Sequence, residues 1–152
     1  MRFSFFKKKT FFTVAEKQRV VDAIRKAEQR TSGEVRVYVE SKNTYVDPMD
    51  RAAEIFYNLK MDKTDERNAV LLYIAVKDKE LALFGDEGIY KATGESFWNN
   101  AVKEMLKEIT AQDIIGGMVH CIGKIGETLH EKFPYNKLED KNELPDEIVF
   151  GK

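Results

Sequence analysis

The sequence predicts an α/β fold, specifically a three-layer α/β/α sandwich in which a small mixed β-sheet has helices on both faces. Residues 69–76 form an almost continuous apolar run, which is typical of a central strand buried on both sides by layers of helix. Residues 34–40 alternate polar with β-branched or aromatic side chains, the pattern of a second strand. The chain has 152 residues, 43% of them hydrophobic and 34% charged, so it fits one globular domain.

The first half of the chain predicts the order helix, strand, helix. Thr13 and Glu16 have the spacing of a capping box, in which each side chain satisfies a backbone amide, so a helix is expected over 14–31. The strand at 34–40 follows. An aspartate before a proline then predicts the start of a second helix, which covers 47–60.

The second half predicts a hairpin followed by two helices. A charged loop over 61–68 leads into the buried strand, and the short reversal at 77–79 predicts an antiparallel partner over 80–84. Apolar side chains at helical spacing then predict helices over 97–109 and 115–129. A small mixed sheet covered by four helices results.

The sequence predicts a single domain over 14–133 with a distinct segment at each side. Residues 1–13 are basic and aromatic, and they are expected to pack on the domain, with contact to a partner or an anionic membrane surface as the alternative. Residues 134–152 mix charges with prolines, so this tail is expected to lie over the surface or to be partly disordered.

Charge and cysteine content narrow the classes of partner. Lysine and arginine total 25 against 26 acidic residues, so no large positive field favours nucleic acid. No apolar run approaches the roughly 20 residues of a transmembrane helix, and charges interrupt the region where an export signal needs its apolar core. The single cysteine, Cys121, fits a reducing compartment. We expect a cytoplasmic protein without a transmembrane segment.

Standard catalytic motifs fail when their spacing is tested. His120-Cys121 resembles the start of a cysteine phosphatase loop, but Glu127 stands where that loop needs an arginine. A Walker-like pattern at Gly117, Gly123 and Lys124 has one residue too many and lacks the metal-binding hydroxyl. Zinc pairs, serine nucleophile elbows and dinucleotide-binding loops are absent as sequence patterns. No catalytic residue is predicted.

Strand directions predict that acidic side chains gather at one edge of the sheet. A strand, helix, strand unit makes the first two strands parallel, and the hairpin makes the third antiparallel to the second. The start of the first strand, the start of the second and the end of the third therefore meet. The candidate metal ligands at this edge are Glu34, Asp65, Glu66, Asn68, Asp86 and Glu87.

Carboxylate and amide oxygens are the ligands that Ca²⁺ accepts, so these residues predict a divalent-cation site, with Ca²⁺ as the expected ion. Gly85 and Gly88 would allow tight turns and supply carbonyl oxygens. The alternative is a solvated acidic edge in which some carboxylates pair with Lys63 or Arg67. The same carboxylates could also hold a metal for phosphate-ester hydrolysis.

Three short motifs resemble those of the TPM domain family, and they occur in the expected order. They are Arg30-Thr31-Ser32-Gly33-Glu34, Arg67-Asn68-Ala69-Val70-Leu71-Leu72 and Phe84-Gly85-Asp86-Glu87-Gly88-Ile89. The resemblance covers about 14–133 and implies an α/β/α sandwich. It places Glu34, Asn68, Asp86 and Glu87 at the functional edge, whereas Asp65 and Glu66 follow from connectivity alone.

What the resemblance implies about function is diverse. Relatives in chloroplasts are linked to photosystem II repair and acid phosphatase activity, relatives in animals modulate receptors, and calcium binding is known in the family. Typical members carry an export signal and a membrane anchor, and have glycine where Ala69 stands here. From the acidic edge and the failure of every catalytic motif tested, we expect a non-enzymatic, calcium-binding interaction domain with an unidentified protein partner. The alternative is a metal-dependent acid phosphatase acting on phosphomonoesters.

Overall fold

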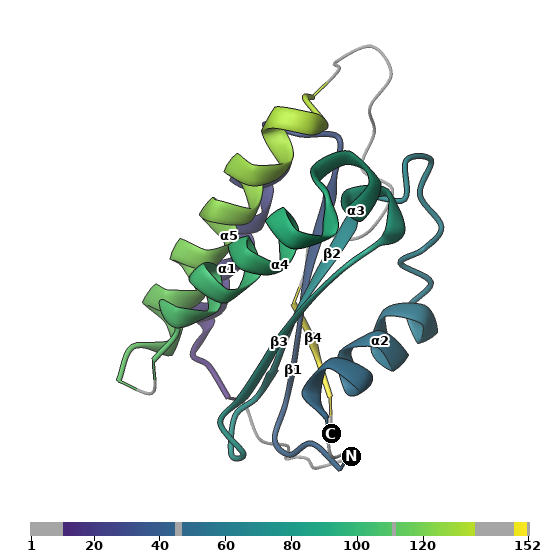
Figure 1. The fold of residues 1–152 in the computed structure, drawn as a ribbon. Coiled ribbons are helices and arrows are strands. Elements are labelled where there is room, and N and C mark those ends of the chain that lie inside the picture. The colour runs from purple at the N-terminus through teal and green to yellow at the C-terminus, as the bar shows by residue number, and fades with distance from the viewer. Residues whose placement is uncertain (1–10, 45–46, 111, 136–147, 152) are drawn as a thin grey trace.

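The computed structural model describes residues 11–44, 47–110, 112–135 and 148–151 (Figure 1). Its helices and strands follow the predicted order, with one helix and one strand that were not predicted. In chain order they are α1 (Val14–Glu28), β1 (Glu34–Glu40), α2 (Pro48–Asn58), β2 (Ala69–Ala75), β3 (Glu80–Gly85), α3 (Glu87–Thr93), α4 (Glu95–Lys107), α5 (Ile114–Lys132) and β4 (Ile148–Phe150).

The strands form one mixed sheet in the order β3-β2-β1-β4. β1 runs parallel to β2, with Glu34 opposite Ala69, and β3 runs antiparallel to β2, with Gly85 opposite Val70. Both directions were predicted from the connections, and both are confirmed. All seven residues of β2 are buried, as its continuous apolar run indicated.

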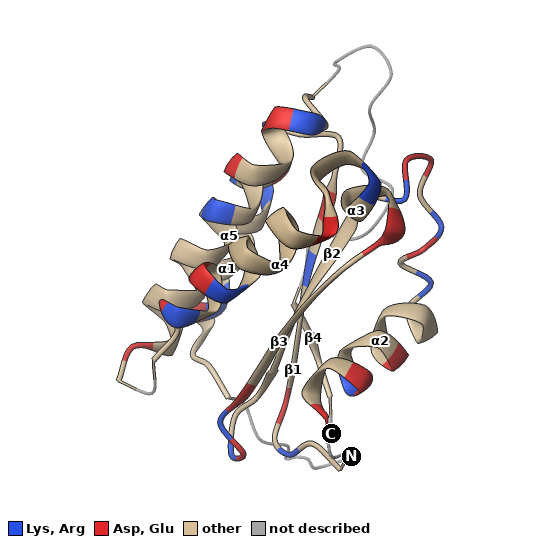
Figure 2. Ribbon diagram, viewed as in Figure 1, with Lys and Arg blue, Asp and Glu red and all other residues tan. Residues whose placement is uncertain are grey.

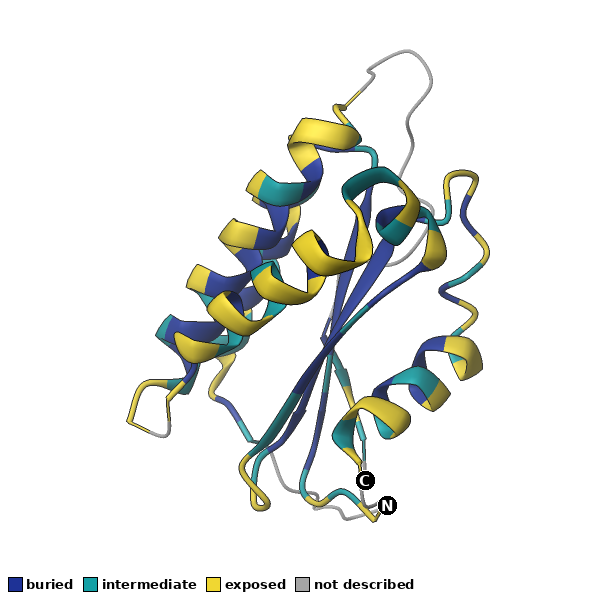
Figure 3. Ribbon diagram, in the orientation of Figure 1, coloured by how far each residue is buried: buried dark blue, intermediate teal, exposed yellow. Residues whose placement is uncertain are grey.

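Helices cover both faces of the sheet, which confirms the three-layer α/β/α sandwich (Figure 1). α1, α4 and α5 lie over the face to which Val37 and Leu72 point, whereas α2 covers the face that carries Tyr73. The core has two parts because alternate side chains of each strand enter opposite layers. Figure 3 shows the strands buried along most of their length and the helices exposed on their outer sides.

The predicted helix starts have the expected side-chain caps. Thr13 and Glu16 make both hydrogen bonds of a capping box, and Asp47 accepts a hydrogen bond from the Met49 amide. α1 ends at Glu28, before the predicted 31. Residues 29–31 turn toward the chain after α5 instead, where Thr31 forms an isolated bridge with Pro134.

α3 was not predicted, because the sequence pattern at 85–88 was interpreted only as the end of the hairpin. Asp86 is the N-cap of this short helix and accepts a hydrogen bond from the Glu87 amide at 2.8 Å. Gly94, with a φ of 91°, separates α3 from α4. A helix of seven residues is too short to show a clear apolar period in the sequence.

β4 was not predicted either, since it lies within the charged tail. Val149 pairs with Tyr38 of β1 in parallel, so part of the tail completes the sheet. The rings of Phe11 and Phe12 lie 6.2 and 6.0 Å from the Phe150 ring. Phe11 and Phe12 thus pack on the domain, whereas the earlier part of the predicted aromatic segment lies outside the described residues.

Within the described part of the chain, no helix has the length and apolar character needed to cross a bilayer. The cytoplasmic location expected from the sequence stays a prediction.

Candidate functional site

The predicted edge of the sheet exists as a meeting point of three chain segments. The β1–β2 and β2–β3 registers bring the starts of β1 and β2 together with the end of β3. The Asp86 amide donates to the Ala69 carbonyl at 3.0 Å, which extends the pairing beyond the last strand residue. Figure 2 shows basic residues among the acidic ones in the loop before β2, so this edge is mixed in charge.

Asp86 is occupied by an arginine. The Arg67 guanidinium donates to both carboxylate oxygens of Asp86, at 2.7 and 2.9 Å, and lies 3.5 Å from a Glu87 oxygen. Hydrogen bonding to Asp86 raises the pKa of Arg67 above its ordinary value. The Asp86 side chain is 1% exposed and also caps α3. A cation that bound Asp86 would have to displace the guanidinium, so this carboxylate has a structural role.

The loop before β2 is locked against the start of α3. The Gly88 amide donates to the Arg67 carbonyl at 2.9 Å, and a Cβ on Gly88 would lie 2.1 Å from the Glu66 carbonyl oxygen. Only glycine allows this approach. Arg67 itself has a φ of 52°, which aims its side chain out of the regular strand path and toward Asp86.

A second group of polar side chains forms at the same edge, and we call it the Ser32 cluster: Ser32, Glu66 and Asn68. The Ser32 hydroxyl donates to Glu66 Oε1 at 2.8 Å. Asn68 Nδ2 lies 3.2 Å from both Ser32 Oγ and Glu66 Oε1. Asn68 is 1% exposed, whereas Glu66 faces solvent. The cluster joins the loop after α1 to the loop before β2.

The remaining two predicted residues stand apart from both groups. Glu34 is buried as the first residue of β1, and strand alternation places it on the sheet face of Tyr38, which α2 covers. Asp65 is exposed and makes no hydrogen bond or ion pair with the described residues. Among those residues, no three His, Cys, Asp or Glu side chains are arranged to hold one metal ion.

Sequence reasoning underestimated two residues of this edge. Ser32 was considered only as part of a family motif, yet its hydroxyl connects Glu66 with Asn68. Arg67 was named as a partner that could neutralise an acid, and the structure shows that role at Asp86. In the sequence, Arg67 is recognisable only as a residue that precedes the start of β2. Its pairing with Asp86 can be inferred only once the end of β3 is known to lie beside that start.

A further charged network lies at the opposite end of β1. Arg51 of α2 donates to both oxygens of buried Glu40 at 2.9 Å, and the Tyr73 hydroxyl donates to the same carboxylate. Burial, followed by the hydrogen bond to Glu40, raises the pKa of Tyr73. The Glu40 carboxylate is thereby satisfied, and it anchors α2 on the sheet.

The fold and its polar edge define a small α/β domain with a mixed four-stranded sheet. Comparison with known proteins shows which solved structures it is similar to. The chain is 40% identical to the BA42 protein of the psychrophilic bacterium Bizionia argentinensis, whose NMR structure superimposes with a TM-score of 0.84 over 96% of this chain and 99% of BA42. The N-terminal domain of cg2496 from Corynebacterium glutamicum is 16% identical, with a TM-score of 0.47 over 82% of this chain and 76% of that domain. A search of curated proteins gives no match.

The model of the TPM domain matches residues 6–128. The chain belongs to the TPM domain family, as the three motifs predicted. The match begins before residue 14 and ends before residue 133, the limits predicted for the domain.

Proposed function

We propose that this TPM domain is a non-enzymatic interaction domain that binds a divalent cation, Ca²⁺, at the Ser32 cluster. The observation that carries the proposal is the contact among Ser32, Glu66 and Asn68, three oxygen-bearing side chains from two loops within 3.2 Å of one another. The other candidate carboxylates are less suitable, because Asp86 is bound to Arg67 and Glu34 is buried on the α2 face.

The donors of the Ser32 cluster suit a hard cation as part of a coordination shell. Ca²⁺ takes about six to eight oxygens, which include carboxylates, amide and backbone carbonyls, and water. Asn68 now directs its amide nitrogen at Ser32 and Glu66, and a half-turn of the amide would present its oxygen instead. With a single carboxylate in the cluster, we expect a dissociation constant of about 10⁻⁴ to 10⁻³ M.

The first prediction is that Glu66→Gln weakens calcium binding at least about tenfold, because it removes the only formal charge of the cluster. The measurement is a CaCl₂ titration followed by backbone amide shifts near Ser32 and Asn68. Asp65→Asn is the matched control, since it removes a neighbouring exposed charge that makes no hydrogen bond or ion pair within the described part of the chain, and it should change affinity less than about twofold. Equal losses in the two variants would show that the edge attracts cations only diffusely.

The alternative of a metal-dependent acid phosphatase has weaker support from the geometry. Arg67 has the guanidinium that could hold a phosphate at this edge, and it is bound to Asp86 and Glu87. Hydrolysis of a generic phosphomonoester by the purified protein in the presence of Ca²⁺, Mg²⁺ or Mn²⁺ would favour the enzyme over the binding domain.

A further inference from the structure

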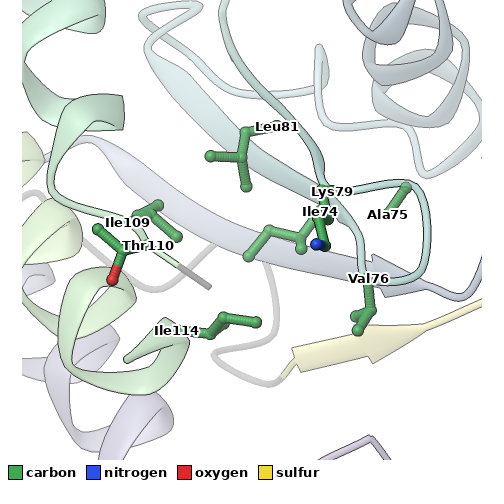
Figure 4. A pocket seen from close by; sticks show the side chains of 8 residues that line it. All are labelled: Ile74, Ala75, Val76, Lys79, Leu81, Ile109, Thr110 and Ile114. Carbon is green, nitrogen blue, oxygen red and sulfur yellow. The ribbon is translucent and has the colours of Figure 1, made fainter. Parts of the chain in front are cut away.

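A cavity lies at the opposite end of the sheet from the Ser32 cluster. It has a volume of about 410 Å³, which falls within the range of small-molecule sites, roughly 300 to 1,000 Å³. It lies where β2 ends and β3 begins, against the connection from α4 to α5 (Figure 4). β2 spans seven residues, so at about 3.3 Å per residue the cavity lies roughly 20 Å from the Ser32 cluster.

The cavity wall is mostly apolar and comes from two strands, one helix and the connections beside them. Ile74 and Leu81 are paired in register on β2 and β3, and Ile109, just after α4, and Ile114, at the start of α5, face them. Figure 4 shows these four side chains directed toward a common space. Three of the four belong to strands or a helix, whereas Ile109 lies in the connection between α4 and α5.

One basic side chain borders the cavity. Lys79 is the charged side chain among the lining residues, and Thr110 adds a hydroxyl. The acids that flank Lys79 in the sequence accept hydrogen bonds from Asn43, whose backbone amide donates to Asp78 at 2.7 Å and whose side-chain amide donates to Glu80 at 2.6 Å. Within the described part of the chain, Lys79 has no salt-bridge partner.

From this combination we infer that the cavity binds an amphipathic carboxylate, a medium-length alkyl chain with one anionic head. The alkyl chain lies among the isoleucine and leucine side chains, where burial of apolar surface stabilises it. The carboxylate pairs with Lys79 at the rim, in contact with solvent. This inference is independent of the proposed cation site, since the two share no residue.

The test uses the full chain and octanoate, with octan-1-ol as the neutral probe of the same length. We expect saturable amide shifts confined to Ile74–Leu81 and to the residues around Ile109 and Ile114. Lys79→Met keeps the aliphatic stem and should weaken octanoate about fivefold, the effect of one partly exposed ion pair, while octanol binds as before. Lys77→Met is the matched control, because Lys77 is exposed on the same turn and does not line the cavity.

A cavity-filling variant tests whether binding depends on the apolar wall, independently of the ion pair between the carboxylate and Lys79. Ile114→Phe should abolish binding of both probes while the amide spectrum elsewhere keeps its folded pattern. The inference is overturned if octanoate gives no saturable shifts, or if Ile114→Phe leaves binding intact. It is also overturned if Lys77→Met weakens octanoate as much as Lys79→Met, or if Lys79→Met weakens octanol equally.

Discussion

At the scale of single residues, burial decides which titratable groups are available for chemistry. Cys121 is fully buried in α5 beneath the sheet, and desolvation raises the pKa of its thiol to about 12. A thiol in this state is neutral and inert near neutral pH, because the thiolate is the reactive form. Cys121 lies within the helix that apolar spacing predicted over 115–129. The residue is therefore a small hydrophobic part of the core.

The raised pKa of Cys121 predicts a loss of stability in alkaline solution. Above pH 9, the ordinary thiol pKa, the unfolded chain releases a proton that the folded chain keeps until about pH 12. The free energy of unfolding should therefore fall by up to about 1.4 kcal/mol per pH unit in this window, relative to Cys121→Ala. Urea unfolding of both proteins between pH 7 and 10.5 measures it. A constant difference between the two across that range would contradict the prediction.

At the scale of elements, the Asp86 carboxylate stabilises both the start of α3 and the loop before β2. Asp86 caps α3 and holds Arg67, and through Arg67 it fixes the loop that leads into β2. A sequence pattern cannot show this combination, because the helix is short and the arginine lies 19 positions away. One of the predicted metal ligands is thus engaged in holding two elements together.

We predict that Asp86→Ala lowers the free energy of unfolding by about 2 kcal/mol or more, since it removes a cap and a buried acceptor together. Asp47→Ala is the matched control. Asp47 caps α2 but is exposed and makes no ion pair with the described residues, so its loss should cost about 1 kcal/mol. Denaturant unfolding followed by far-UV circular dichroism gives both values. Similar costs for the two substitutions would mean that the Arg67 contact adds no stability.

At the scale of the whole molecule, the two chain ends that the structure describes meet on one strand. β4 covers the edge of β1, and Phe150 packs with Phe11 and Phe12, while Lys17 lies 5.4 Å above the Phe150 ring. An open edge of β1 would present unpaired backbone groups to other chains. The last strand therefore protects the sheet as well as extending it.

Removal of residues 148–152 should lower the melting temperature by several degrees and promote self-association through the uncovered β1 edge. Calorimetry and light scattering at several protein concentrations check the two effects. Phe150→Ala is the companion variant, because it keeps the strand pairing but loses the ring contacts. It should reduce the melting temperature without association. A shortened protein that melts like the full chain and stays dispersed would show that β4 is dispensable.

The sequence by itself determined the layers, the strand directions and the family. The capping box at Thr13, the alternation over 34–40 and the apolar run of β2 are local patterns, and each is formed by neighbours in the chain. Their order then fixed which strand ends share an edge, because parallel and antiparallel connections leave few arrangements.

Only the tertiary structure decided how the acidic edge divides. It brought Arg67 to Asp86, joined Ser32 to Glu66 and Asn68, turned Glu34 to the α2 face and placed β4 beside β1. It also formed the apolar cavity beside Lys79 from segments separated along the chain. Side-chain partners of this kind depend on distances between segments that are remote in sequence. Those distances cannot be inferred from local composition.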